Sequence, residues 1–284
     1  MTSLQNKAPR SGDHRRNLWV LIALALTAAI ASSGTADTRA STKPAAASQQ
    51  ERDDYRTAAA ATSGAALDKS AHEFSAKYPQ SALRVYLFEK ALRQYQIEND
   101  SVGVQDAAKA VLTISPDDPL ALVLTATTLA DELSALEADR DKKVSEIRRS
   151  ADLAIHNLDR GVLPAAAAPQ QAPLYRTTLQ AMAYSALGIM KLKTGDDSGA
   201  EKDLKTAVEL AKARPDPSIW YHLALAQEHR KKYSAAINSV EQAMQLASGN
   251  PQLQHLAEME HDRLWRLAGR NKDSSDSSNN PSPK

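Results

Sequence analysis

The stretch "MAYSALGIMKLKTGDDSGAEKDLKTAVEL", from Met182 to Leu210, decides the fold. Its apolar residues recur at the three- and four-residue spacing of one helix face, which predicts two amphipathic helices. A Gly-Asp-Asp break at 195–197 separates them, because glycine readily adopts the left-handed conformation that ends a helix. Ser198 followed by Glu201 predicts a capping box at the start of the second helix.

The same pattern occurs again thirty-six residues further along the chain, in "YHLALAQEHRKKYSAAINSVEQAMQL". The matched pairs are Tyr184 with Trp220, Leu187 with Leu223, Gly188 with Ala224, Ala200 with Ala236, Leu204 with Val240, Ala207 with Ala243 and Leu210 with Leu246. A small residue at the third of these positions lets a neighbouring helix approach closely. Asp216-Pro217 precedes the second copy, and proline is well tolerated at the first position of a helix. An upstream copy runs from Phe88 to Val111 and ends in "SPDDP" at 115–119.

These copies resemble the tetratricopeptide repeat, whose first helix carries a bulky residue, a leucine and a small residue, and whose second carries alanine, a large apolar residue and alanine. The upstream copy departs from that motif because Ala91 stands at the leucine position and Leu92 at the small one. The resemblance implies an all-α fold: an α-solenoid of tetratricopeptide-like helix-turn-helix repeats over residues 66–268. The amphipathic segment 251–268 is then expected to be a C-terminal capping helix, with either Met259 or Glu260 on its buried face.

Between 119 and 161 two periodic apolar segments flank the charged "EADRDKK" at 137–143. We interpret them as a helical hairpin that turns at this charged stretch, and one continuous helix is the alternative. "VLPAAAAPQQAP" at 162–173 is expected to be a loop. Upstream, "YPQS" at 78–81 predicts a helix that ends before the proline and a new one capped by Ser81.

The N-terminus has the layout of a secretory signal peptide at 1–36. A basic cluster at 14–16 precedes an apolar run at 18–31, and small residues lead to a cleavage site after Ala36. The alternative is an uncleaved inner-membrane anchor over 18–33. Both interpretations predict an exported protein of a bacterial periplasm or cell envelope. The range 37–65 is expected to be a linker that becomes helical late, and 269–284 a disordered tail.

The composition argues against several kinds of chemical site and partner. The 284-residue chain has no cysteine, so it can form neither a disulfide nor a thiolate metal site, and its net charge of +1 gives no electrostatic case for nucleic acid. His255, Glu258 and His261 lie three apart, whereas a zinc site on a helix needs histidines at i and i+4, so a solvated helix face is expected. With no phosphate loop or nucleophile elbow in view, the sequence predicts no enzyme, no cofactor and no metal site.

The resemblance implies a concave groove that binds a peptide or protein segment. Carried over from the family, the groove positions are Met182, Ser185, Ile189, Leu192, Lys193, Ser218, Tyr221, Leu225, Glu228 and His229. In the upstream copy they are Tyr86, Glu89, Arg93, Gln96 and Ile97. Their mixture of apolar and charged residues suits an apolar or helical peptide. Ile189 and Leu225 stand where the branch that grips C-terminal carboxylates has asparagine, which argues against that branch.

The sequence therefore predicts a non-enzymatic interaction scaffold or adaptor of the cell envelope. Two alternatives stay open. One is an enzyme or small-ligand-binding protein with a pocket near the middle hairpin. The other is a membrane-tethered assembly factor, if the N-terminal segment is not cleaved.

Overall fold

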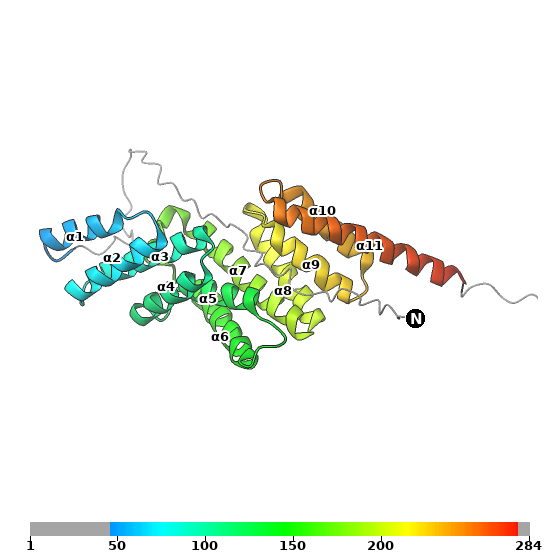
Figure 1. Cartoon of the computed structure of the whole chain (residues 1–284), viewed down its shortest axis with the longest axis horizontal. Helices are drawn as coiled ribbons and strands as arrows, with labels where there is room; N and C mark the ends of the chain where they lie inside the picture. The colour runs from blue at the N-terminus through cyan, green and yellow to red at the C-terminus, as the bar shows by residue number, and fades with distance from the viewer. Residues whose placement is uncertain (1–45, 278–284) are drawn as a thin grey trace, which may run out of the picture.

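The computed structural model describes residues 46–277, with side chains as far as residue 269, and it is built from helices alone within that range (Figure 1). The α-helices are α1 (Gln49–Ala59), α2 (Gly64–Lys77), α3 (Leu83–Glu98), α4 (Ser101–Ile114), α5 (Pro119–Glu132), α6 (Arg140–Asp159), α7 (Ala172–Thr194), α8 (Asp197–Leu210), α9 (Pro217–His229), α10 (Tyr233–Leu246) and α11 (Pro251–Ser277). Two short 3-10 helices, Pro169–Gln171 and Ala211–Ala213, precede α7 and follow α8.

Consecutive helices pack as hairpins that follow one another along the long axis of the molecule (Figure 1). The pairs are α3 with α4, α5 with α6, α7 with α8 and α9 with α10. Between hairpins, α4 packs on α5, α8 packs on α9, and α7 also reaches α5 and α6. Helix α11 covers α10 at the far end, as expected of a capping helix. Of the two residues that were alternatives for its buried face, Glu260 is buried and Met259 is exposed.

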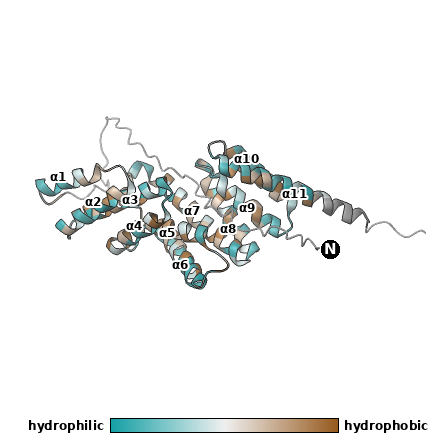
Figure 2. Ribbon diagram, in the orientation of Figure 1, coloured by the Kyte–Doolittle hydropathy of each residue, from teal (hydrophilic) through white to brown (hydrophobic). Residues whose placement is uncertain are grey.

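The buried apolar side chains form three clusters in series. The largest covers α1 to α7, the second joins α7, α8 and α9, and the third joins α9, α10 and α11. Figure 2 shows α5 as mainly hydrophobic, while α1 and α6 expose hydrophilic faces. Each hairpin buries its apolar stripe only by stacking on the next, so the core is a chain of neighbour interfaces.

Aspartate caps the start of several helices. The carboxylate oxygens of Asp100, Asp118, Asp196 and Asp216 accept hydrogen bonds from the backbone N–H two or three residues ahead, at 2.8 to 3.0 Å. Each one satisfies a donor that has no partner within the helix. Asp216-Pro217 thus opens α9 as the sequence predicts, and Gly195 takes the expected left-handed conformation at φ 87°.

The capping box of Ser198 and Glu201 was a wrong prediction. Helix α8 begins at Asp197, and its N-cap is Asp196, whose side chain accepts from the N–H of Gly199. Because the helix starts before Ser198, that residue lies inside the first turn, and Glu201 instead becomes a buried partner of three cations. At the other predicted cap, Ser81 accepts from the N–H of Leu83, but α3 itself begins only at Leu83.

The middle segment is a hairpin, as the sequence predicts, and the alternative of one continuous helix is wrong. The connection between α5 and α6 spans 133–139. This connection begins before the charged stretch 137–143, where the turn was expected. It shares only residues 137–139 with that stretch, because α6 already begins at Arg140.

Both ends of the repeat region are more helical than composition suggests. Helix α1 and the start of α2 lie inside the range 37–65, and Tyr55 of α1 meets the ring of Phe74 edge-on at a centroid distance of 6.0 Å. Helix α11 continues to Ser277, inside the range 269–284. The predicted signal peptide or anchor lies outside the described residues. Among the residues described, no helix is long and apolar enough to span a bilayer.

Candidate functional site

The groove positions carried by α7 are mostly covered. Met182, Ser185 and Ile189 are only 4%, 7% and 6% exposed, and Met182 and Ile189 belong to the largest apolar cluster. Helix α5 packs against α7, so these three side chains offer almost no surface to a partner. Leu192, one turn further on, stays half-buried.

Lys193 is also engaged within the fold. Its Nζ donates hydrogen bonds to the carbonyl oxygens of Ala130 at 2.8 Å and Asp131 at 2.6 Å, in the last turn of α5. A lysine in this place satisfies helix-end carbonyls that have no intrahelical partner. Lys193 therefore ties the middle hairpin to the C-terminal end of α7.

The groove positions of α9 are more open. Tyr221, Leu225 and Glu228 are half-buried and His229 is exposed, whereas Ser218 is buried and donates to the Asp216 cap at 2.8 Å. Tyr221, Leu225 and Glu228 lie at successive turns of one helix face, which we call the α9 face. Glu228 pairs with Arg263 of α11, and His229 lies 2.9 Å from the carboxylate of Asp197.

In the upstream copy a segment of the chain itself binds one of the predicted groove residues, Glu89, whereas Ile97 is 46% exposed. Glu89 is fully buried on α3, and its two carboxylate oxygens accept hydrogen bonds from the backbone N–H groups of Ala165 at 2.6 Å and Ala166 at 3.0 Å. Both donors belong to the loop 162–171 between α6 and α7, which we call the strap. Glu89 is thus committed to the strap instead of being available to a partner.

Charged and aromatic side chains surround the Glu89 carboxylate. Arg93 donates to it at 2.7 Å, and the buried Tyr175, from the start of α7, lies close to both. Asp118, the cap of α5, is buried beside it. Burial, together with the neighbouring charge of Glu89, raises the pKa of Asp118 to about 8. The strap therefore covers a cluster in which one carboxyl group is held protonated at neutral pH.

A second strongly perturbed group lies where the hairpins of α5, α7 and α9 meet. Burial raises the pKa of Asp131 to about 7, although the nearby Lys193 ammonium opposes the shift, and Asp216 adds repulsion. Burial also lowers the pKa of His222 to about 4, so this histidine is neutral at pH 7, with Nδ1 2.8 Å from the carbonyl oxygen of Ser218. These groups lie at a junction between repeats.

His255, Glu258 and His261 all lie on α11. His255 and Glu258 are exposed, and His261 lies 3.4 Å from Glu241 of α10. Across residues 46–269 there is no group of three or more His, Asp or Glu side chains placed to hold a metal ion.

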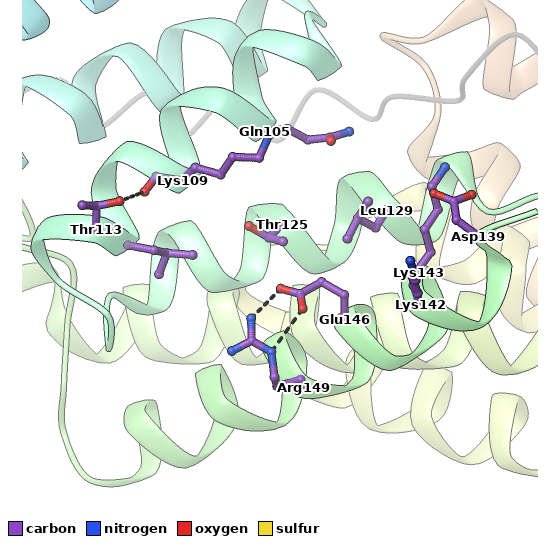
Figure 3. A pocket seen from close by; sticks show the side chains of 11 residues that line it. Gln105, Lys109, Thr113, Thr125, Leu129, Asp139, Lys142, Lys143, Glu146 and Arg149 are labelled. Atoms are coloured by element: carbon purple, nitrogen blue, oxygen red, sulfur yellow. Dashed lines mark hydrogen bonds and ion pairs between the residues drawn. The ribbon is translucent and has the colours of Figure 1, made fainter.

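A cleft at the middle hairpin is lined by residues of α4, α5 and α6, and Figure 3 shows their side chains. Its volume is about 640 Å³, within the range of about 300–1,000 Å³ common for ligand sites. Thr125 and Leu129 of α5 lie between the side chains of the two walls, as Figure 3 shows. In one wall, Arg149 donates two hydrogen bonds to Glu146, at 2.6 and 3.1 Å. That contact lowers the pKa of Glu146.

The two best-matched repeats have equivalent environments in the structure. Tyr184 packs partly buried between the first and second apolar clusters, and Trp220 packs in the same way between the second and third. At the small position, a methyl group added to Gly188 would lie 2.5 Å from Cγ of Leu204, so only glycine fits between α7 and α8. The fold is a tetratricopeptide-like α-solenoid.

Known proteins give a distant likeness to this solenoid. No family model matches the chain, and no curated protein matches it. Among solved structures, a thermophilic TPR protein of Thermus thermophilus, TTC0263, is similar with 14% identity and a TM-score of 0.48, over 74% of this chain and 98% of that one. The MamA protein is similar with 17% identity and a TM-score of 0.33, over 70% of this chain and 97% of that one.

The Cut9-Hcn1 assembly of the APC/C is a third similar structure, with 16% identity and a TM-score of 0.35, over 77% of this chain and 43% of that one. The helix pairs of the chain itself, rather than these likenesses, define its solenoid.

Sequence reasoning missed the strap and the extra length of α7. Helix α7 has 23 residues, whereas the equivalent α9 has 13. Its added turns place Tyr175 near Glu89 and Arg93 of α3. A signal was present: the α6–α7 connection is much longer than the other repeat boundaries and is rich in alanine and proline, yet composition alone cannot show where a loop packs.

Proposed function

We propose that this chain is a non-enzymatic interaction scaffold that binds a peptide or protein segment on its C-terminal half, through the α9 face. The observation that carries the proposal is the contrast between the two halves. Glu89 is bound by the strap and Arg93 is paired with Glu89, while Met182 and Ile189 are buried in the largest apolar cluster. Tyr221 and Leu225 keep accessible surface.

The chemistry of the α9 face suits a polypeptide. A tyrosine and a leucine one turn apart offer apolar contact area and one hydroxyl group, and aromatic residues of this kind dominate protein interfaces. Burial raises the pKa of Tyr221, so its hydroxyl stays protonated and can donate a hydrogen bond. The nearby ion pair of Glu228 with Arg263 adds a charged edge that can select among partners.

The shifted groups also support binding over proton-transfer catalysis. At the cleft, hydrogen bonding lowers the pKa of Glu146 and raises that of Lys143, so both are charged near pH 7. A general acid or base works best with a pKa near the working pH. Asp118 and Asp131 do have such values, but each is committed to the fold, Asp118 as a helix cap and Asp131 at a repeat junction.

The test is site-specific photo-crosslinking in cells. A photoreactive amino acid in place of Leu225 is expected to capture a defined partner, whereas the same amino acid in place of Gln242, exposed on α10, captures none. Tyr221→Ala/Leu225→Ala, checked for folding by circular dichroism, is expected to abolish co-purification of that partner. Equal capture from both sites, or unchanged co-purification by the double variant, would refute the α9 face.

We further propose that the protein is exported, as the segment at 1–36 suggests, to a bacterial periplasm or cell envelope. Mass spectrometry of the mature N-terminus tests this. A chain that begins near Asp37 indicates a released scaffold, and a retained 18–33 segment in the membrane fraction indicates a tethered one. Recovery of the full-length chain from the cytosol would contradict export.

A further inference from the structure

The cleft between α4 and α6 combines an apolar floor with basic walls. Leu129 of α5 and Leu112 of α4 are half-buried there, so part of their apolar surface faces the open cleft. None of the residues that line the cleft belongs to the predicted groove or the α9 face. The cleft is therefore a separate surface. It is formed by α4 and α6, each the second helix of its hairpin, and by α5, the first helix of the middle hairpin, which lies between them (Figure 3).

Positive charge dominates its walls. Four of the lining side chains are cationic, Lys109, Lys142, Lys143 and Arg149, and two are anionic, Asp139 and Glu146. Between residues 140 and 149 the sequence holds five basic and two acidic side chains. This local excess contrasts with the chain as a whole, whose net charge is only +1.

Three of the four cations are available to a partner at little cost, whereas Lys143 is paired with Glu137 at 2.9 Å and is mostly covered. Arg149 pairs with Glu146 and Lys109 with Asp106, but the side chains of both cations are more than 60% exposed. Exposed pairs contribute about 0–1 kcal/mol, so exchanging them for a partner's carboxylates costs little. The side chain of Lys142 makes no hydrogen bond or ion pair with any described residue. It also lies in the first turn of α6, where the helix dipole disfavours a cation.

We propose that this cleft docks an acidic amphipathic helix from a partner protein. Leucine-like side chains on one face of that helix would contact Leu112 and Leu129, and carboxylates at its edges would reach Lys109, Lys142 and Arg149. A groove between helices with an apolar floor is the usual seat for an amphipathic helix, and complementary charge sets its orientation and partner choice. The scaffold then has two surfaces, one on α9 and one at the middle hairpin.

Fluorescence anisotropy with designed peptides tests the proposal. The probe is a helical peptide with leucine at i, i+3 and i+7 and mostly glutamate elsewhere. One comparison peptide replaces glutamate with lysine, and another scrambles the same composition to remove the leucine stripe. We expect the acidic striped peptide to bind and the other two to bind at least about tenfold more weakly. Its affinity should fall as salt rises, because exposed charges are screened.

Matched charge reversals locate the site. Lys142→Glu/Arg149→Glu is expected to weaken binding by about tenfold or more. Arg148→Glu/Lys212→Glu makes the same change in net charge at exposed positions outside the cleft, and it should change affinity by less than about twofold. Tyr221→Ala/Leu225→Ala should bind the peptide as wild type does. If the reversal disturbs folding, Lys142→Gln/Arg149→Gln should still weaken binding severalfold.

Several results would overturn the proposal. Absence of binding, equal binding of the lysine or scrambled peptide, or equal loss in both charge-reversal variants would each do so. Binding of phosphatidylglycerol vesicles but not of the peptide would assign the cleft to an anionic membrane surface instead. Loss of binding in Tyr221→Ala/Leu225→Ala alone would move the peptide to the α9 face, which contradicts this inference and supports the proposed function.

Discussion

The contact between Gly188 and Leu204 sets how closely α7 and α8 approach, and a double-mutant cycle measures it. A Cβ atom at 188 would lie 2.5, 3.0 and 3.3 Å from three side-chain carbons of Leu204, which is itself fully buried. Alanine at 188 therefore overpacks the interface in the presence of leucine. With alanine at 204 the same methyl group fills empty space.

Two opposing effects fix the magnitudes. Overpacking costs about 1–3 kcal/mol, while replacing glycine inside a helix gains about 1 kcal/mol. Gly188→Ala alone should therefore lower the free energy of unfolding by about 0–2 kcal/mol. Leu204→Ala alone should cost about 2–5 kcal/mol. In that background Gly188→Ala should stabilise by about 1–2 kcal/mol, from the helix gain and one buried methyl group. The coupling is thus about 1–4 kcal/mol.

Urea unfolding followed by far-UV circular dichroism gives the four free energies. Gly249→Ala is the control, because a Cβ there would meet nothing within 4 Å, and it should not lower stability. The m-values should agree among the variants, which shows that the same transition is compared. If Gly188→Ala has the same effect in both backgrounds, within about 0.5 kcal/mol, then α7 and α8 are not spaced by this glycine and the repeat register is wrong.

Three further predictions concern the buried charges. The raised pKa of Asp118 means that the folded state keeps a proton that the unfolded state releases between about pH 4 and 8, so stability should fall across that window by up to about 1.4 kcal/mol per pH unit. Asp118→Asn keeps the α5 cap and should flatten this slope in pH-dependent urea melts; an unchanged slope contradicts the assignment. Glu89→Ala should cost about 3–5 kcal/mol and accelerate amide hydrogen exchange at Ala165 and Ala166, and unaltered exchange there would mean that the strap does not depend on Glu89. At Glu201, hydrogen bonds from Lys205 and Lys232 outweigh burial and lower the pKa to about 2, so its stabilisation should be complete above about pH 4.5 and lost as the pH falls toward 2. Glu201→Gln should remove that acid limb from melting curves recorded over pH 2–5, and retention of the limb would show that another carboxylate causes it.

Local sequence rules predict the repeat architecture because each helix pair is specified by residues close together in the chain. The spacing of Tyr184, Leu187 and Gly188 marks one helix face, and the break at 195–197 marks its end. Helix caps are less predictable, since two neighbouring polar residues can both serve. The N-cap of α8 is Asp196 and not Ser198, so Glu201 is not part of a capping box. Its carboxylate instead pairs with Arg230 and Lys232 from the next repeat.

The sequence by itself therefore determined the helical hairpins, their order and the small residues that space them. Only the tertiary structure decided which groove positions remain open. Glu89, Ile189 and Leu225 are all assigned to the groove by the resemblance, yet the strap binds the first and the second is buried in the largest apolar cluster. Exposure depends on segments far away in the chain, such as the backbone N–H groups at 165 and 166, and no local periodicity encodes where a loop comes to rest.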